Sequence, residues 1–224
     1  MDDVLSRAPL FTALDDEAAS AVRTSMTEVS LRRGDLLFSE GEAGDSLYVI
    51  TDGKLKLGRS SVDGRENLLA VLGPGEMFGE LSLFDPGPRT ATATALTDTE
   101  LVALGHDHLR PWLAGRPEVA LQLLQALAQR LRRTNANLAD LVFSDVPGRV
   151  AKALLDLSER FGVPQDDGVH VAHELTQEEL AQLVGASRET VNKALADFAA
   201  RGWLRLEGRG VVLLDAERLE HRAR

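Results

Sequence analysis

Residues 117–143 read PEVALQLLQALAQRLRRTNANLADLVF, with no proline or glycine after the first position. Apolar residues recur there at every third or fourth position, which predicts one helix of about 40 Å at roughly 1.5 Å per residue. A heptad seam of this length favours pairing with a second copy of the chain. The seam consists of Ala120, Leu124, Leu127, Leu131, Thr134, Leu138 and Leu141.

A core helix on its own domain is the alternative to this pairing. A second apolar stripe, made of Leu121, Leu123 and Ala128, predicts that the helix also packs against its own body. Thr134 is the one polar member of the seam, and Asn135 follows it directly. Because a buried hydroxyl costs roughly 1–3 kcal/mol unless it is hydrogen-bonded, this pair either fixes the register or faces a ligand.

Composition limits the classes of function. The 224 residues suffice for two small domains and a connector, and the net charge of −10 argues against a nonspecific binder of polyanions. The absence of cysteine excludes disulfides, thiolate zinc sites and cysteine-ligated clusters, and the five histidines are scattered, so no metal is expected. No catalytic nucleophile or acid–base pair stands out. The amino terminus has no signal pattern and no run of about 18 apolar residues occurs, so we expect a cytoplasmic protein without a membrane partner.

Short alternating strands separated by glycines fill residues 28–104, after short helices within residues 2–26. Strands at this spacing predict a barrel or a jelly roll. They are expected at residues 29–31, 36–38, 47–50, 54–58, 67–72, 90–95 and 100–104.

The sequence GELSLF, beginning at Gly79, interrupts the strand pattern with a short helical turn. The amides at a helix start attract an anion, and Arg89 can donate twice to the same anion while Thr90 adds a hydroxyl. Glu80 would repel that anion unless it accepts a hydrogen bond from a neighbouring hydroxyl such as a ribose 2′-OH. An anion beside a sugar hydroxyl describes a nucleotide. The alternative is a surface turn in which Glu80 pairs with Arg89.

The carboxyl-terminal part follows a predicted hinge at residues 144–148. Within it, Thr176 and Glu179 form a capping box, Gly185 ends the helix that they start, and Ser187 caps the next helix. Two helices joined by a turn of this length predict a helix-turn-helix motif.

The second of these helices places Arg188, Glu189, Asn192 and Lys193 on its outer face. Arginine can donate twice to guanine and glutamate can accept from cytosine, so this face can read bases. A solvated helix surface is the alternative, but the capped turn before the helix favours DNA. From Val146 onward eleven Lys or Arg stand against thirteen Asp or Glu, a net charge of −2, so binding must depend on where the cations lie.

A loop at residues 162–168, a strand at 169–172 and a two-stranded wing at 202–214 complete this part of the chain. Arg205 and Arg209 of the wing are candidates for phosphate contacts.

Two segments resemble those of a known family. FGELSLFDPGPRTATATA, residues 78–95, resembles the phosphate-binding cassette of cyclic-nucleotide-binding domains, and SRETVNKAL, residues 187–195, resembles the recognition helix of the catabolite activator (cyclic AMP receptor protein) regulators. The resemblance covers the whole chain and is strongest to the actinobacterial branch of this CRP/FNR family. It implies an α+β fold with a nucleotide-binding β-roll (jelly roll) at residues 1–115, a dimerisation helix at 116–143, a hinge at 144–148 and a winged helix-turn-helix at 149–224.

The resemblance also implies roles for individual residues. Gly79 and Ser82 would present backbone amides, Glu80 would hold the ribose hydroxyl, and Arg89 with Thr90 would bind the cyclic phosphate. Thr134 would meet the adenine amino group from its own chain, and Asn135 would approach it from the partner chain. The implied cyclic AMP site is Gly79, Glu80, Leu81, Ser82, Arg89, Thr90, Thr134 and Asn135. The implied DNA contacts are Ser187, Arg188, Glu189, Asn192, Lys193 and Arg209.

The function implied by the resemblance is that of a cyclic AMP-responsive transcription regulator. A homodimer would bind double-stranded DNA at an inverted pair of TGTGA-like half-sites, with RNA polymerase as a further partner. The chain departs from the family pattern at Asn135, where many members carry serine, and at Lys193, where arginine is usual. One alternative is a DNA-binding regulator that needs no nucleotide or responds to another ligand such as cyclic di-GMP. A second alternative is a regulatory domain of an enzyme or channel, for which no further residues remain.

Overall fold

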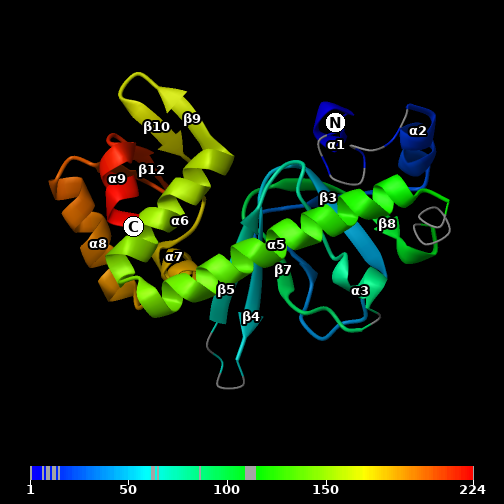
Figure 1. Cartoon of the computed structure of the whole chain (residues 1–224), viewed down its shortest axis with the longest axis horizontal. Helices are drawn as coiled ribbons and strands as arrows, with labels where there is room; N and C mark the ends of the chain where they lie inside the picture. Colours follow the sequence, from blue (N-terminus) through cyan, green and yellow to red (C-terminus); the bar gives the residue numbers. More distant parts are fainter. Residues whose placement is uncertain are drawn as a thin grey trace. The chain divides into compact units, whose positions relative to one another are not determined.

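The computed structural model describes residues 2–6, 8, 11, 14, 16–61, 64, 66–85, 87–108 and 115–223. The chain divides into two compact units, one made of residues 1–59 and 69–132 and one made of residues 60–68 and 133–224. Figure 1 shows both and labels many of their helices and strands. Antiparallel sheets dominate the first unit and helices with a small sheet form the second, which confirms the predicted α+β class.

Two antiparallel four-stranded sheets form the first unit, in the orders β1-β8-β3-β6 and β2-β7-β4-β5. Each predicted strand is present with small shifts at its ends. Only β6 was not predicted, because two residues show no periodicity. The strands are β1 (Thr27–Leu31), β2 (Leu36–Phe38), β3 (Ser46–Asp52), β4 (Leu55–Ser60), β5 (Glu66–Leu72), β6 (Met77–Phe78), β7 (Thr92–Ala95) and β8 (Thr99–Gly105).

Two apolar cores hold this unit together. One joins both sheets and includes Phe38 and Phe78. The other joins β3 and β8 to the helices α1 (Asp2–Leu5), α2 (Asp16–Thr24) and α5 (Pro117–Phe143). The helices α1 and α2 confirm the short helices predicted within residues 2–26, and the turn at GELSLF contains α3 (Leu81–Phe84).

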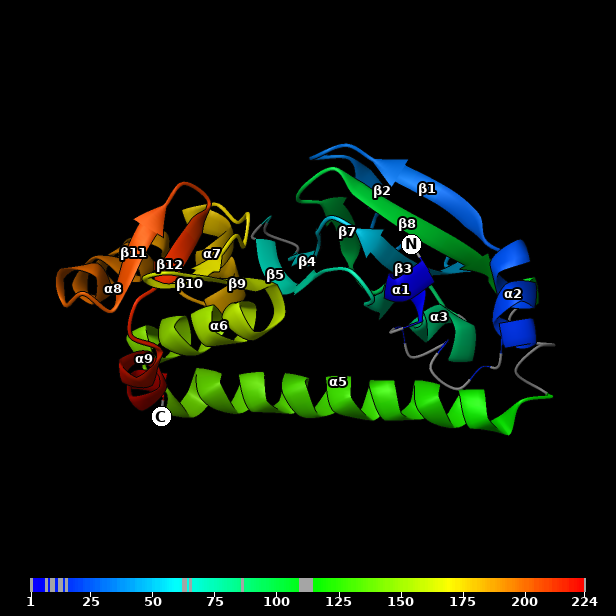
Figure 2. The ribbon, with the colours of Figure 1, turned by 90° about the horizontal axis from the view of Figure 1, so that it is seen from above.

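Helix α5 runs without interruption from Pro117 to Phe143, as predicted, and Figure 2 shows its whole length. Val119 and Leu123 are its buried residues, so the helix packs against its own body through them. The predicted second stripe is therefore only partly right, because Leu121 is 55 % exposed and Ala128 is exposed as well. Leu121 lies two positions from both Val119 and Leu123, and residues two apart point to different sides of a helix.

Besides the end of α5, the second unit contains four helices and a four-stranded sheet within the described residues. The strand predicted at 169–172 and the predicted two-stranded wing are three of the four strands of this sheet. The loop predicted at residues 162–168 contains β9, which pairs with β10, and Pro164 is tolerated because β9 lies at the sheet edge. Helix α9 was not predicted. The elements are α6 (Val146–Phe161), β9 (Gly162–Gln165), β10 (Gly168–Val171), α7 (Gln177–Val184), α8 (Arg188–Ala200), β11 (Leu204–Glu207), β12 (Gly210–Leu213) and α9 (Ala216–Ala223).

The connection between α5 and α6 is shorter than the hinge predicted at residues 144–148. Only Ser144 and Asp145 are non-helical, because α6 begins at Val146. Pro147 lies in the first turn of α6, where a helix needs no hydrogen bond from the backbone nitrogen. The Asp145 carboxylate caps this helix by accepting a hydrogen bond of 2.9 Å from the Gly148 amide.

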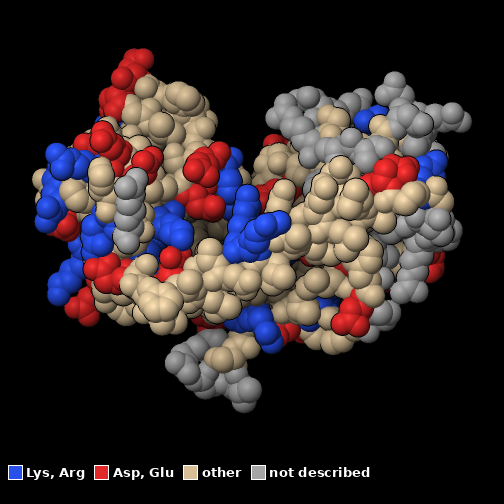
Figure 3. Space-filling view, viewed as in Figure 1, with Lys and Arg blue, Asp and Glu red and all other residues tan. Residues whose placement is uncertain are grey.

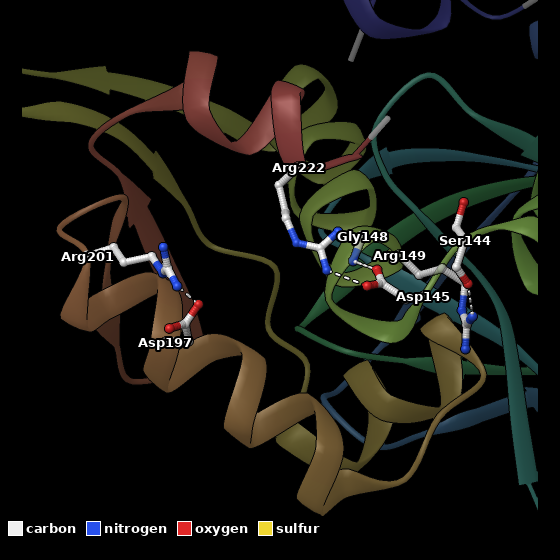
Figure 4. A network of polar contacts seen from close by, with 7 residues as sticks. All are labelled: Ser144, Asp145, Gly148, Arg149, Asp197, Arg201 and Arg222. Carbon is white, nitrogen blue, oxygen red and sulfur yellow. Dashed lines mark hydrogen bonds and ion pairs between the residues drawn. The ribbon is translucent and has the colours of Figure 1, made fainter.

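Two arginines tie this connection to the rest of the second unit (Figure 4). Arg149 donates to the Ser144 carbonyl at 2.7 Å and to the Val184 carbonyl, at the end of α7, at 2.9 Å. Arg222 of α9 donates to the Asp145 carboxylate at 2.6 Å. The start of α6 is thus held by polar contacts to both α7 and α9.

Candidate functional site

A cavity in the first unit collects six of the eight residues predicted to bind the nucleotide. Strands β2, β4, β5 and β6, helices α3 and α5, and the segment before β7 all contribute to its wall. Thr134 and Asn135 are not among the lining residues and are exposed on α5. The lining residues are Phe38, Leu57, Leu69, Phe78, Gly79, Glu80, Leu81, Ser82, Pro88, Arg89, Thr90, Ala91 and Arg130.

Arg89 is the buried cation of this cavity, with 5 % of its surface exposed. Its Nη1 donates to the Gly79 carbonyl at 3.3 Å and to the Ser82 hydroxyl at 3.4 Å. Gly79 has a φ of +82°, and a Cβ there would lie 2.8 Å from the same Nη1. Position 79 therefore requires glycine both for its backbone conformation and for the close approach of the arginine.

Glu80 is the buried anion, with 2 % of its surface exposed. Its Oε1 accepts a hydrogen bond of 2.8 Å from Arg130 of α5, so the alternative pairing of Glu80 with Arg89 is not what the structure shows. Arg130 is not among the residues predicted from the sequence. The available signal was its place on α5 one turn before Thr134, since residues four apart share a helix face.

Two buried polar atoms of the cavity have no hydrogen-bond partner among the described residues: Arg89 Nε and Glu80 Oε2. Buried polar atoms are almost always satisfied, so these two atoms are able to bond a polar ligand in the cavity. An arginine donor next to a carboxylate acceptor fits a ligand that carries an anion and a hydroxyl. The side chains of Leu57, Leu69 and Leu81 add apolar wall for a flat base.

The residues that cap α7 and α8 define the helix-turn-helix of the second unit. The Thr176 hydroxyl accepts from the Glu179 amide at 3.1 Å while the Glu179 carboxylate accepts from the Thr176 amide at 2.8 Å, which confirms the predicted capping box. Gly185 ends α7 in the left-handed conformation at φ 65°, and the Ser187 hydroxyl accepts from the Thr190 amide at the start of α8. These local contacts fix the turn between the two helices.

Helix α8 buries Val191, Leu195 and Phe198, as its sequence predicts. Arg188, Glu189 and Lys193 are exposed on its other side, whereas Asn192 is half-buried. Its Oδ1 is buried without a hydrogen-bond partner among the described residues. Three of the predicted base-reading side chains are thus presented together, while Ser187 is engaged as a cap.

The wing presents one of its two predicted arginines. Arg209 is exposed at the turn between β11 and β12. Arg205 instead contacts Asp167 and donates to Glu207 at 2.8 Å, so its guanidinium is paired with two carboxylates in this structure. Its hydrogen bond to Asp167 raises the pKa of the Arg205 guanidinium and lowers the pKa of the Asp167 carboxyl.

Two further findings concern the residues that the structure describes. No group of three His, Asp or Glu side chains is arranged to hold a metal ion. None of the described helices combines the length and the apolar character needed to cross a bilayer.

Comparison with known proteins matches each unit to a family. Residues 28–115 match the cyclic nucleotide-binding domain, and residues 148–222 match the Crp-like helix-turn-helix domain. A relative from Mycobacterium tuberculosis, described as a CRP-like cAMP-activated global transcriptional regulator, is 58 % identical over all of both chains. The chain belongs to the CRP/FNR family of transcription regulators. Membership confirms the predicted resemblance, including its actinobacterial branch, and the prediction that the chain is not an enzyme.

Two solved structures have a similar fold. FixK2 from Bradyrhizobium japonicum has a TM-score of 0.78 at 26 % identity, over 88 % of this chain and 96 % of that one. CLP from Xanthomonas campestris, described as a c-di-GMP responsive global regulator, has a TM-score of 0.77 at 26 % identity, over 89 % of this chain and 99 % of that one.

Proposed function

We propose that this CRP/FNR regulator is a cyclic AMP-responsive homodimer whose affinity for operator DNA depends on the bound nucleotide. The observation that carries the proposal is the pair of buried, oppositely charged side chains in the cavity, Arg89 and Glu80, each with an atom left unpartnered among the described residues. The relative that is 58 % identical is described as cAMP-activated, which supports the choice of nucleotide.

In this proposal Arg89 and Thr90 bind the cyclic phosphate, together with the amides around Gly79, Leu81 and Ser82. A planar guanidinium donates two parallel hydrogen bonds to a phosphate, and such charge-assisted bonds are the strong ones. Glu80 accepts a hydrogen bond from the ribose hydroxyl. Thr134 contacts the adenine amino group from its own chain, and Asn135 approaches it from the partner chain.

The homodimer is supported by the exposed face of α5. Leu124, Leu131 and Leu138 of the predicted seam are each more than half exposed in the single chain, and about half of Leu141 is exposed. In Figure 3 the surface over α5 is mainly tan, with basic groups beside its middle. A heptad-spaced leucine face of this kind is buried when two helices pair. A second copy of the chain is therefore its proposed partner.

On DNA, we assign base reading to Arg188, Glu189 and Lys193 and a phosphate contact to Arg209, with Ser187 and Asn192 at the edge of the same surface. Two recognition helices related by the dimer axis fit half-sites about 34 Å apart, which is one turn of B-DNA. The proposed site is an inverted repeat of TGTGA-like half-sites. RNA polymerase is the proposed partner at the promoter, and the cytoplasm is the proposed location, where the chromosome is accessible.

The second candidate is a regulator that responds to another ligand, such as cyclic di-GMP, or to none. The structural similarity to CLP, which is described as c-di-GMP responsive, supports this second candidate. The buried Glu80 and the compact cavity around Arg89 support a single ribose and a single phosphate instead.

Operator binding measured with and without nucleotide tests the proposal. The full chain is titrated into a labelled duplex with the inverted repeat, at one salt concentration, alone and with cyclic AMP or cyclic di-GMP. We expect cyclic AMP alone to tighten binding, and calorimetry to show about 1.5–3 kcal/mol weaker cyclic AMP binding in Arg89→Ala. Equal operator affinity under all three conditions would contradict nucleotide control.

A further inference from the structure

Arg89 is a buried cation without a carboxylate in close contact. The Asp45 carboxylate is 3.9 Å from its Nη2, but the Asp45 side chain is 89 % exposed, and Glu80 bonds Arg130 instead. The Nε of Arg89 has no hydrogen-bond partner within the described part of the chain. The hydrogen bonds to Gly79 and Ser82 are long, at 3.3 and 3.4 Å, and together with the exposed Asp45 they compensate the buried charge only in part. Because burying a charge is strongly unfavourable, a further contact should stabilise the guanidinium.

Aromatic rings supply that contact. The Cζ of Arg89 lies 4.3 Å from the centroid of the Phe38 ring and 5.5 Å from that of the Tyr48 ring. Both distances are within the range of about 6 Å over which a cation is attracted to an aromatic face. We call Phe38 and Tyr48 the aromatic seat. The two rings are 5.9 Å apart, and Phe78 packs on both, at 6.1 Å from Phe38 and 5.4 Å from Tyr48.

The seat attracts the guanidinium through the electrons of its rings and contributes no anion of its own. A guanidinium has five N–H donors, so such a contact is compatible with an anion that accepts from them. Phe38 lines the cavity together with Arg89. Phe38 lies on β2 and Tyr48 on β3, which belong to different sheets of the first unit. The packing of the two sheets therefore fixes the position of the Arg89 guanidinium.

We propose that Phe38 and Tyr48 are positioning residues that hold Arg89 ready for the phosphodiester anion of the nucleotide. The proposal rests on the proposed function for the identity of that anion. A guanidinium held in advance loses little side-chain freedom on binding, so the seat increases affinity without touching the phosphate. A lysine at position 89 could not use the seat in the same way, because an ammonium lacks the planar face and the fork of donors.

A double-mutant cycle on cyclic AMP binding tests the seat. Calorimetry with the full chain compares Phe38→Leu and Tyr48→Leu in two backgrounds, wild type and Arg89→Gln. We expect each leucine to weaken binding roughly 3- to 30-fold in the wild-type background, the scale of a desolvated cation–π contact. In the Arg89→Gln background each leucine should change affinity by less than about twofold. Equal losses in both backgrounds, or none in either, would overturn the proposal.

Two controls separate positioning from general destabilisation. Tyr48→Phe keeps the ring and should retain wild-type affinity within about twofold. Ile50→Ala removes a fully buried side chain from the same core as Phe38 but outside the cavity lining, so it should lower stability and leave the affinity of the folded protein unchanged. A loss of affinity in Ile50→Ala as large as in Phe38→Leu would show that the effect is merely structural.

Denaturant unfolding of the unliganded chain gives a second cycle that needs no nucleotide. The effects of Phe38→Leu and Arg89→Gln on stability should be coupled. The unfolding equilibrium constant of the double variant should be at least threefold smaller than the product of the two single effects predicts. This cycle applies if wild type fails to bind cyclic AMP, or if Arg89→Gln binds too weakly to titrate. If the chain does not bind cyclic AMP but the two substitutions are coupled in unfolding, the proposed function is refuted and the contact between Arg89 and the seat stands. If their effects on stability are additive, the seat itself is refuted.

Discussion

Glu80 is the single residue whose surroundings constrain the candidate site most. Its carboxylate is almost completely buried, and Arg130 satisfies one oxygen at 2.8 Å. A buried carboxylate that loses its paired cation is left uncompensated, which is costlier than losing a surface ion pair. The interaction therefore links the packing of α5 to the chemistry of the cavity through one hydrogen bond.

Replacing Arg130 by methionine should lower the free energy of unfolding by about 1–3 kcal/mol, because Glu80 stays buried without a partner. Denaturant titration of the full chain measures the change. Arg132→Met, at an exposed position of the same helix, is the matched control and should be close to neutral. The double variant Glu80→Gln with Arg130→Met should recover part of the loss. An Arg130→Met protein as stable as the parent would contradict this account of the pair.

At this scale the sequence predicts residues that act through local pattern and misses those that act at a distance. Glu80, Arg89 and Thr90 lie within eleven positions, where a helix start and a returning arginine are visible. Arg130 is 50 positions from Glu80, and the packing of α5 through Val119 and Leu123 determines that the two meet. The pairing of Arg205 with Asp167 has the same cause, since the two lie 38 positions apart.

At the scale of elements, helix ends decided by their own residues were predictable and those decided by tertiary contacts were not. The capping box at Thr176, the glycine end at Gly185 and the cap at Ser187 occur as predicted. The hinge was predicted too long because proline is compatible with the first turn of a helix as well as with its end. Helix α9 was missed because only Leu219 along it is buried.

The contact of α9 with the start of α6 predicts a pH dependence. The hydrogen bond from Arg222, and then the one from the Gly148 amide, lower the pKa of the Asp145 carboxyl. A lowered folded pKa stabilises the protein above the unfolded pKa of about 3.9 and ceases to do so as pH falls through the folded value. Arg222→Gln should therefore be less stable at pH 7, by about 0.5–1 kcal/mol for so exposed a pair, and the difference should shrink below about pH 4.5.

Urea unfolding at a series of pH values measures that difference between parent and variant. Arg218→Gln, an exposed arginine on the same helix, is the control and should show no such trend. A stability difference that persists unchanged at low pH would mean that Arg222 acts through packing rather than through the Asp145 carboxylate.

At the scale of the whole molecule, α5 belongs to both units, since one division between them falls after Arg132. The helix brings Arg130 to the cavity on one side of that division and carries Thr134 and the exposed Leu138 on the other. A ligand can shift the arrangement of a regulator only through its different affinity for the two states. Moving the population from 1:99 to 99:1 requires a preference of roughly 5.5 kcal/mol, which no single contact supplies.

Thr134 should contribute one part of that preference, because its place in the seam lets it respond to the nucleotide and to the partner helix together. In Thr134→Val we expect cyclic AMP to stimulate operator binding about tenfold less than in the parent, which corresponds to one lost hydrogen bond of about 1.4 kcal/mol. The dimer dissociation constant, measured by sedimentation, should change little, since valine is apolar and of similar size. Leu138→Ala should do the reverse and weaken the dimer first. If cyclic AMP stimulates operator binding equally in Thr134→Val and the parent, Thr134 has no part in coupling nucleotide binding to operator binding. The leucines of the seam would then have to account for that coupling without it.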